Sequence, residues 1–235
     1  MSEFQKKLDE VAADSKYAEG VNAATIEYSF KVFDRFLRDG TVLELGPAEG
    51  IMTAHLVGRG LDITCVDGAA QFCAALRYRY PDIEVVNSLF EDYQPDKSFD
   101  NIVLGHVLEH VEDPVAVLEL VKQWLKPDGL VLTAVPNAMS LHRQAAVIMG
   151  LIESEKSMSE LDYHHGHHRV FDPFEFRNCF SQAGLTIKVS GGYWMKPVSN
   201  IQIEKDWSAE MLEAFMVLGE RYPDIAGEIY VIASH

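Results

Sequence analysis

The sequence predicts an α/β fold, a Rossmann-like, doubly wound and mostly parallel sheet of seven strands, and three observations support this prediction. Apolar stretches of five or six residues alternate with segments of helical spacing, which is typical of crossover units in a parallel sheet. A chain of 235 residues that is 48% hydrophobic and 24% charged can bury one sizeable core, so we expect one domain over residues 1–235. The stretch VLELGPAEG, residues 42–50, passes from a buried strand into a glycine-bounded turn, as happens at the ligand-binding edge of such sheets.

Seven short apolar segments are expected to form the strands. They are residues 41–45, 63–67, 84–86, 99–105, 129–134, 185–190 and 228–233. A helix is expected after each of the first five strands. The helix at 115–126 has Pro114 in its first turn and ends at the turn sequence KPDG, which matches the preferred start and stop of helices.

Three further segments are expected around this core. Residues 1–38 are predicted to form an N-terminal helical cap, because residues 16–38 carry aromatic side chains at helical spacing. Residues 136–171, after the fifth strand, are expected to be a substrate-side insertion or lid with one apolar helix at 138–151 and a polar, His-rich stretch, since insertions of this size are usually functional. A helix is expected at 208–222, between the last two strands. The aromatic residues of the cap are expected in the core, and they are Tyr17, Tyr28, Phe30, Phe33 and Phe36.

The charge balance argues against two classes of partner. The chain has 20 Lys and Arg against 36 Asp and Glu, and its formal net charge of -16 would repel nucleic acid and anionic membrane surfaces. The first residues, MSEFQKKLDEVAADSK, lack the apolar core of a signal peptide, and no run approaches the ~18 apolar residues of a membrane span. We therefore expect a cytoplasmic location and a small-molecule partner, while the oligomeric state is not predicted.

Cys65, Cys73 and Cys179 fall in apolar patterns without metal-like spacing, and we expect buried thiols.

The turn after the first strand indicates a nucleotide-type site. Glycines there let the backbone approach a ligand closely and point N–H groups at it. Asp67 ends the second strand 21 residues after Gly46, where a carboxylate can accept both hydroxyls of a ribose. Glu44 and Glu49 flank the turn and favour a ligand with a cationic tail over a pyrophosphate. A nicotinamide-dependent Rossmann oxidoreductase and a non-catalytic cofactor-binding module remain alternatives, although the G-x-G-x-x-G spacing of the former is missing.

From about Tyr17 to the C-terminus, the chain resembles the class I S-adenosylmethionine-dependent methyltransferases, because several motifs occur in the family's order. These motifs are VLELGPAEG, VDG, NSLFEDYQPDKSFDNIVL, GHVLEHVEDP and LKPDGLVLTAVPN. The resemblance implies S-adenosylmethionine as cofactor and S-adenosylhomocysteine as product, with Glu44 on the methionine amino group and Asp67 on the ribose. Ser88 stands where the family often has an Asp that accepts the adenine amino group. The residues implied at the cofactor are Tyr17, Glu44, Gly46, Pro47, Ala48, Gly50, Asp67, Gly68, Ser88, Leu89, Phe90, Gly105 and His106.

The same resemblance implies methyl transfer by in-line displacement to a small molecule. Such a reaction mainly needs alignment, and it needs a base only if the acceptor must lose a proton. His106 after the fourth strand, and His165 and His168 in the insertion, are the candidate catalytic residues. An oxygen acceptor is preferred over nitrogen because the insertion is rich in potential bases.

The acceptor pocket is expected to be built from the insertion and from the segment after the sixth strand. The candidate substrate-binding residues are Asn137, His164, His167, Arg169, Tyr193 and Trp194. The alternative is a solvated loop with incidental histidines. No metal site is expected, because the nearly consecutive side chains of residues 164–168 diverge in most backbone geometries.

Overall fold

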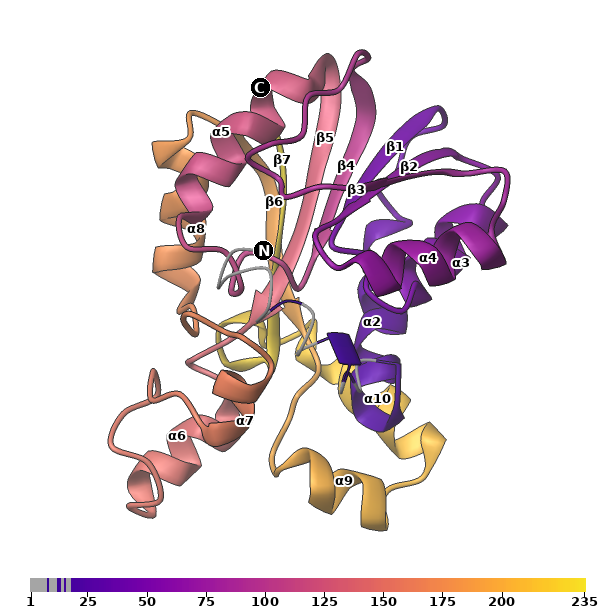
Figure 1. Ribbon diagram of the computed structural model, residues 1–235. Coiled ribbons are helices and arrows are strands. Elements are labelled where there is room, and N and C mark those ends of the chain that lie inside the picture. The colour runs from indigo at the N-terminus through magenta and orange to yellow at the C-terminus, as the bar shows by residue number, and fades with distance from the viewer. Residues whose placement is uncertain (1–7, 9–11, 14, 16–17) are drawn as a thin grey trace.

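The computed structural model describes residues 8, 12, 13, 15 and 18–235, and a seven-stranded sheet forms its centre (Figure 1). The strand order is β3-β2-β1-β4-β5-β7-β6, and β7 runs antiparallel to both of its neighbours. The strands are β1 (Thr41–Leu45), β2 (Asp62–Asp67), β3 (Glu84–Asn87), β4 (Phe99–Gly105), β5 (Leu125–Pro136), β6 (Thr186–Tyr193) and β7 (Glu228–Ser234). The predicted mostly parallel, Rossmann-like sheet is therefore confirmed.

Helices pack on both faces of this sheet. They are α2 (Gly20–Phe33), α3 (Ile51–Gly58), α4 (Ala70–Arg79), α5 (Pro114–Trp124) and α8 (Pro173–Gln182). Because side chains alternate between the faces along a strand, Leu43 and Leu45 of β1 pack in the cluster with α5 and α8, whereas Val42 packs in the cluster with α2, α3 and α4. Figure 1 shows α5 and α8 on one side of the sheet and α2, α3 and α4 on the other.

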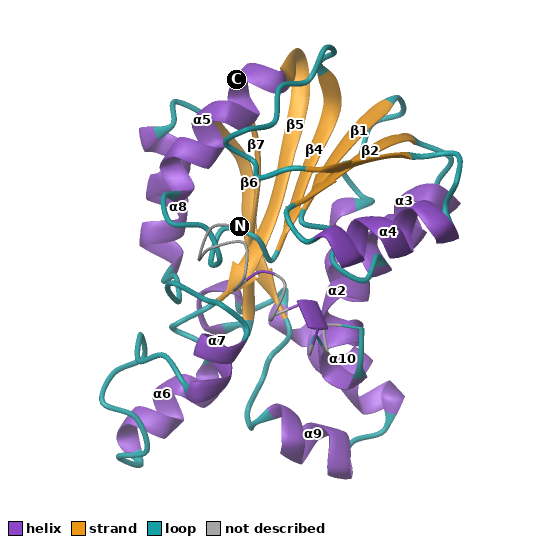
Figure 2. Cartoon of the chain, viewed as in Figure 1, coloured by secondary structure: helices purple, strands orange, loops and turns teal. Residues whose placement is uncertain are grey.

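The remaining helices extend the molecule beyond the end of the sheet at which the parallel strands finish (Figure 2). They are α6 (Leu141–Ile148), α7 (Glu160–His164), α9 (Asn200–Asp206) and α10 (Ala209–Gly219), followed by the short 3-10 helix η1 (Pro223–Ile225). The insertion that contains α6 and α7 is closed at its base by a bridge between Asn137 and Phe171. In the part of the chain that the structure describes, no helix has the length and apolar character needed to cross a membrane.

Two expectations for the core elements were wrong. No helix follows β3, because residues 88–98 form turns that lead directly into β4. The KPDG sequence does not separate α5 from β5, since β5 already begins at Leu125. Phe99 pairs with Leu125 and Asn101 with Leu130, so residues 126–129 bulge out of a continuous strand.

The helices expected in the N-terminal cap, in the insertion and between the last two strands exist, but with different bounds. The helix expected at 138–151 is shorter and begins after Ser140, as α6, while α7 and α9 were not expected. The helix expected at 208–222 is α10. The cap helix expected over 16–38 is α2, and of its aromatics Tyr28 and Phe33 are buried while Phe30 and Phe36 are partly buried.

Two remaining expectations concern side chains. Tyr17 lies outside the described residues. All three cysteines are free and buried, as expected.

Candidate functional site

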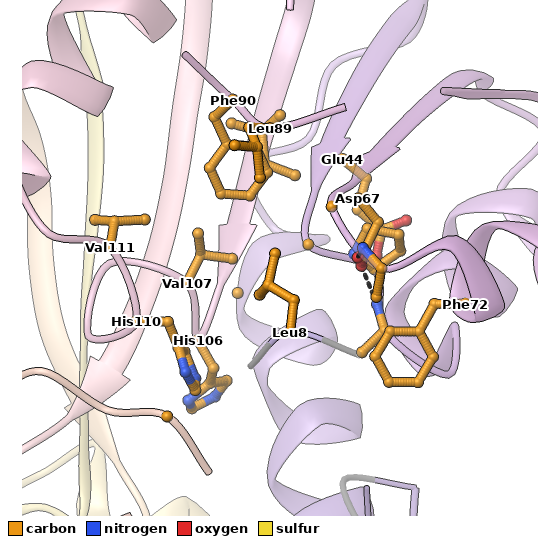
Figure 3. A pocket seen from close by; sticks show the side chains of 18 of the residues that line it. Leu8, Glu44, Asp67, Phe72, Leu89, Phe90, His106, Val107, His110 and Val111 are labelled. Atoms are coloured by element: carbon orange, nitrogen blue, oxygen red, sulfur yellow. Dashed lines mark hydrogen bonds between the residues drawn. The ribbon is translucent and has the colours of Figure 1, made fainter. Parts of the chain in front are cut away.

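A pocket of about 500 Å³ opens at the carboxyl ends of β1, β2 and β4, the edge at which open α/β sheets bind ligands. Figure 3 shows Glu44, Asp67 and Phe72 on one side of this pocket, with His106 and His110 on the other. Most of the expected site residues line it. They are Glu44, Gly46, Pro47, Ala48, Gly50, Asp67, Gly68, Leu89, Phe90, Gly105, His106, His165 and His168.

The floor of the pocket is the turn between β1 and α3. Gly46, Ala48 and Gly50 have φ angles of 65°, 47° and 83°, in the left-handed region that favours glycine. A Cβ atom on Gly46 would lie 2.9 Å from Val107, and one on Gly50 would lie 2.5 Å from Leu76. Gly46 therefore keeps the backbone bare beside a residue of the pocket wall, whereas Gly50 leaves room for Leu76 of α4.

Asp67 holds this turn from the end of β2. One carboxylate oxygen accepts a hydrogen bond from the backbone of Ala48 at 3.2 Å, and the other accepts one from Ala69 at 2.8 Å. Burial raises the pKa of Asp67 to about 6, and the two backbone bonds oppose that rise. The carboxylate thus lies between the turn and the pocket, where it can accept hydrogen bonds from ligand hydroxyls.

Glu44 is the second acid of this side, and it is 2% exposed. Its Oε2 accepts hydrogen bonds from Thr53 at 2.7 Å and from the Cys65 thiol at 3.5 Å. Burial raises its pKa to about 7. Among the described residues Glu44 has no cation within ion-pair distance, so a cationic ligand group would stabilise its charged form.

Leu89 and Phe90 form an apolar end of the pocket, and Leu8 and Phe72 also lie in its wall (Figure 3). This surface suits the faces of a planar ring. Ser88 does not line the pocket, and its hydroxyl donates to the carbonyl of Leu89 at 2.8 Å, so its position does not support the expected adenine contact.

The carboxylates nearest that apolar end are supplied a few residues later. Glu91 and Asp92 line the pocket and were not singled out in the sequence. The groups of this half fit S-adenosylmethionine, because Gly46 leaves the turn bare, the Asp67 carboxylate at the pocket can accept from ribose hydroxyls, and Glu44 has no protein cation beside it among the described residues.

His106 begins the opposite half of the pocket. It follows β4 directly, has a φ angle of 58°, and its backbone N–H donates to Ala134 at 2.9 Å. A positive φ in a residue other than glycine costs about 1–3 kcal/mol and occurs preferentially at functional sites. The strained backbone turns the imidazole into the pocket, where its side chain is 16% exposed.

The two nitrogens of His106 meet different partners. Nδ1 lies 3.6 Å from Glu109 Oε1 and 3.7 Å from Glu228 Oε2. Nε2 lies 3.3 Å from the Ser29 hydroxyl and 3.4 Å from the Tyr193 hydroxyl, and those two hydroxyls are 2.5 Å apart. The carboxylates favour a proton on Nδ1, which leaves the lone pair on Nε2.

The charges of this group are coupled. Burial disfavours the imidazolium, but Glu109 and Glu228 outweigh it and raise the pKa of His106 above its ordinary value. Burial raises the pKa of Glu228 to about 7, and His106 opposes that rise. Burial also acts to raise the pKa of Glu109, but the neighbouring histidines hold it below its ordinary value. The site can therefore stabilise a proton on His106.

Sequence reasoning did not identify Glu228. It opens β7, opposite Tyr193 at the end of β6, and it is buried. A signal was present, because Glu228 is the only charged residue in the otherwise apolar strand sequence EIYVIAS. Tyr193 was placed after the sixth strand, but it is the last residue of that strand.

The His-rich stretch forms part of the pocket wall on the His106 side. His165, Gly166 and His168 line the pocket, whereas His164 is exposed and does not. Burial lowers the pKa of His165 below its ordinary value, which favours its neutral form. His167 lies behind the wall, with its ring centroid 4.6 Å from that of His110.

Three other residues expected to bind the substrate, Asn137, Arg169 and Trp194, instead make contacts within the protein. Both amide hydrogens of Asn137 go to backbone carbonyls, those of Asp224 and Ala226. Arg169 donates to the carbonyl of Glu112 at 2.7 Å. These two side chains, with the buried Trp194, do not line the pocket.

Trp194 has a packing role of its own. It has a φ angle of 67° and packs against Lys196, whose Nζ lies 4.6 Å from the ring centroid. Burial lowers the pKa of Lys196 to about 8. Tyr193 does not line the pocket, and its connection to the site is the contact of its hydroxyl with His106.

The comparisons with known proteins agree with this geometry. The family described as methyltransferase domain matches residues 16–188. The chain is 26% identical over 192 residues to the ubiquinone biosynthesis O-methyltransferase of Pasteurella multocida, covering 75% of this chain and 78% of that one. It is 28% identical over 177 residues to the protein of the same name from Glaesserella parasuis, covering 70% and 73%.

The fold also matches solved structures. One is a crystal structure of an S-adenosylmethionine-dependent methyltransferase from Mesorhizobium loti, with a TM-score of 0.64 and 19% identity over 88% of this chain and 98% of that one. At that identity the likeness concerns the fold. The family match removes the oxidoreductase alternative.

Proposed function

The chain belongs to the class I S-adenosylmethionine-dependent methyltransferases, and from that premise we propose that it methylates an oxygen of a small molecule, with His106 as the general base. The observation that carries the proposal is the His106 imidazole in the pocket wall, whose Nδ1 lies near the carboxylates of Glu109 and Glu228. The names of the relatives support an oxygen acceptor for this chain as well.

The residues of the first half of the pocket would bind and orient the cofactor. Glu44 would pair with its amino group, Asp67 would accept its ribose hydroxyls, and the wall around Phe72 and Phe90 would hold its adenine. S-adenosylmethionine supplies a methyl group already activated by a sulfonium, so the protein's main contribution is alignment, which can lower the barrier by about 7–11 kcal/mol in well-oriented systems.

The second half of the pocket would manage the acceptor's proton. As the acceptor oxygen attacks the methyl carbon, its proton would pass to the imidazole of His106, and Glu109 and Glu228 would stabilise the imidazolium that forms. Tyr193 and Ser29 hold the imidazole plane by their hydroxyls. General-base help of this kind is worth about 10²–10⁴-fold in rate.

His165 and His168 would contact the acceptor from the insertion side, since both line the pocket. His164 and His167 are less suited to that role, because the former is exposed and the latter lies behind the wall. Asn137 and Arg169, engaged with backbone carbonyls, would shape the pocket without touching the acceptor.

A combined binding and transfer experiment tests the proposal. Calorimetry should give saturable binding of S-adenosylhomocysteine and none of a nicotinamide dinucleotide. A screen with methyl-labelled S-adenosylmethionine should then label hydroxyl compounds in preference to amines. Labelling of amines alone would contradict oxygen transfer, and a blank screen across all acceptor classes with intact cofactor binding would favour a cofactor-sensing role.

The insertion can be tested in the same assay. His165→Gln should lower turnover or acceptor affinity by about tenfold, because a lost hydrogen bond to an acceptor costs about 0.5–1.5 kcal/mol. His164→Gln is the matched control, since its side chain is exposed in the same segment. Equal behaviour of the two variants with every acceptor would contradict a role for the insertion in the active site.

A further inference from the structure

Three side chains with metal-ligand chemistry meet behind the acceptor side of the pocket. Glu109, His110 and His167 each offer one donor atom, and these atoms all lie within 4.8 Å of one another. Glu109 is 1% exposed, and its Oε2 has no hydrogen-bond partner among the described residues. A buried carboxylate oxygen without a partner is costly, so this position is suited to a cation.

The backbone holds the two contributing segments together. The N–H of His168 donates to the carbonyl of Glu109 at 2.8 Å, and Arg169 donates to the carbonyl of Glu112 at 2.7 Å. These bonds fix the stretch that carries His167 against the loop that carries the other two ligands. Sites that bind metal ions depend on such positioning of the ligand-bearing segments.

Asp162 provides the support expected for a ligating histidine. Its Oδ1 lies 3.4 Å from Nδ1 of His167, and its Oδ2 accepts hydrogen bonds from the backbone and hydroxyl of Ser159. The two groups are not hydrogen-bonded in this geometry, and Nδ1 of His167 is buried without a hydrogen-bond partner among the described residues. A carboxylate beside a ligating histidine is the kind of support found at zinc sites.

The donor set selects the class of ion. Two imidazole nitrogens and one carboxylate oxygen suit zinc and neighbouring divalent transition metals, whereas Mg²⁺ prefers oxygen alone. Zinc bonds of about 2.0–2.1 Å place ligand atoms about 3.3 Å apart in a tetrahedron. The three donors would therefore need to approach by up to about 1.5 Å, which side-chain rotation can supply.

We propose that Glu109, His110 and His167 bind one divalent transition-metal ion, zinc or an ion of the same preference. Three protein ligands leave a coordination position open. His110 also lines the pocket, so the ion would lie at the acceptor side. If the proposed function holds, an acceptor oxygen could take the open position and be polarised there.

No metal site was expected from the sequence, because the histidines of residues 164–168 were compared only with one another as possible ligands. Within this stretch the ring centroids of His164 and His165 lie 5.7 Å apart and those of His165 and His167 lie 6.2 Å apart, and His167 is the one that joins the cluster. Its partners come from the loop after β4, more than fifty residues earlier in the chain. The fold, rather than the local spacing, creates the ligand set.

Cobalt binding to the metal-free protein tests this site without an activity assay. Titration with Co²⁺ should give a visible absorption band that saturates at a one-to-one ratio, and Zn²⁺ but not Mg²⁺ should abolish it. Glu109→Gln and His167→Gln should each weaken Co²⁺ binding by more than about 100-fold, beyond the about 10–100-fold expected for the supporting Asp162→Asn. His164→Gln, from the same stretch but outside the cluster, should bind Co²⁺ like the wild type.

Binding of S-adenosylhomocysteine by each variant checks that the fold is retained, because neither Glu109 nor His167 lines the pocket. Absence of saturable Co²⁺ and Zn²⁺ binding by the wild type would overturn the metal site. Wild-type affinity in both Glu109→Gln and His167→Gln would overturn it as well. A wild type that binds Co²⁺ as expected but not S-adenosylhomocysteine would instead reject the proposed function and leave the metal site supported.

Discussion

The two halves of the pocket are built in different ways. The cofactor half is made by one short turn and the strand ends beside it, with the backbone left bare at Gly46. The acceptor half is made by side chains from separate elements, with His106 held between Glu109, Glu228 and two hydroxyls. The comparison teaches that recognition of the common cofactor depends on local geometry, whereas the chemistry on the acceptor depends on tertiary contacts.

The largest expected effect lies in the acceptor half. His106→Gln should lower kcat by about 10²–10⁴-fold, because the proton acceptor is lost while the side chain keeps a similar size. The Kd of S-adenosylhomocysteine, measured by calorimetry, should change by less than about threefold, since Glu44 and Asp67 are intact. A large loss of cofactor affinity with normal kcat would show that the division into two halves is wrong.

Asp67→Asn should give the next largest effect, now on the cofactor half. Hydrogen bonds to a charged group are worth about 1.5–3 kcal/mol, so the Kd of S-adenosylhomocysteine should rise by about 10–100-fold. At saturating S-adenosylmethionine, kcat should be nearly normal. Asp62→Asn, at the exposed start of the same strand, is the matched control and should leave that Kd unchanged.

A pair of glycine variants separates backbone strain from loss of space. Gly46 and Gly60 both have positive φ angles, of 65° and 76°, but only at Gly46 would a Cβ meet another atom, Val107 at 2.9 Å. Gly46→Ala and Gly60→Ala should both lower stability by about 1–2 kcal/mol. Only Gly46→Ala should also weaken S-adenosylhomocysteine binding, by about 5–30-fold. Equal cofactor affinities in the two variants would contradict the role of the bare turn.

The smallest expected effect is a pH dependence of cofactor binding. Burial raises the pKa of Glu44 from 4.5 to about 7, so its carboxylate becomes charged as the pH rises through neutrality. The affinity for S-adenosylhomocysteine should therefore increase by up to about tenfold between about pH 6 and about pH 8. Asp67, with a pKa of about 6, should add to the slope at the acidic end.

Without cofactor, the folding stability should change with pH in the opposite direction to the cofactor affinity. A carboxyl whose folded-state pKa lies above its unfolded value binds its proton more tightly in the folded protein, so stability falls as the pH rises from about 4.5 to about 7. Glu44→Gln should flatten both profiles, and calorimetry together with thermal unfolding measures them. An unchanged slope in the variant would show that Glu44 does not control cofactor binding.

Much of the cofactor half could be predicted from the sequence. The glycine-bounded turn and Asp67 lie within two neighbouring strands whose apolar patterns are read directly, and most of the residues expected there line the pocket. Ser88 was expected at the cofactor but does not line the pocket, and its hydroxyl donates to the adjacent carbonyl of Leu89. A motif position does not reveal the direction of a side chain.

The acceptor half was only partly predictable. His106, His165 and His168 were identified and line the pocket. Asn137 was also selected, but the fold uses both of its amide hydrogens to hold backbone carbonyls near β7. Nothing in the sequence around residue 137 indicates those carbonyls, since they belong to residues nearly ninety positions later.

The sequence by itself determined the parallel sheet, the bare turn after β1 and the acid at the end of β2. The period of apolar residues and the conformational preference of glycine act over a few residues, so the sequence reveals them directly. Only the tertiary structure brought Glu228 to His106 and His167 to Glu109. Those contacts join the ends of distant elements, and the packing of the whole sheet, rather than any local preference, sets the distances between their charges.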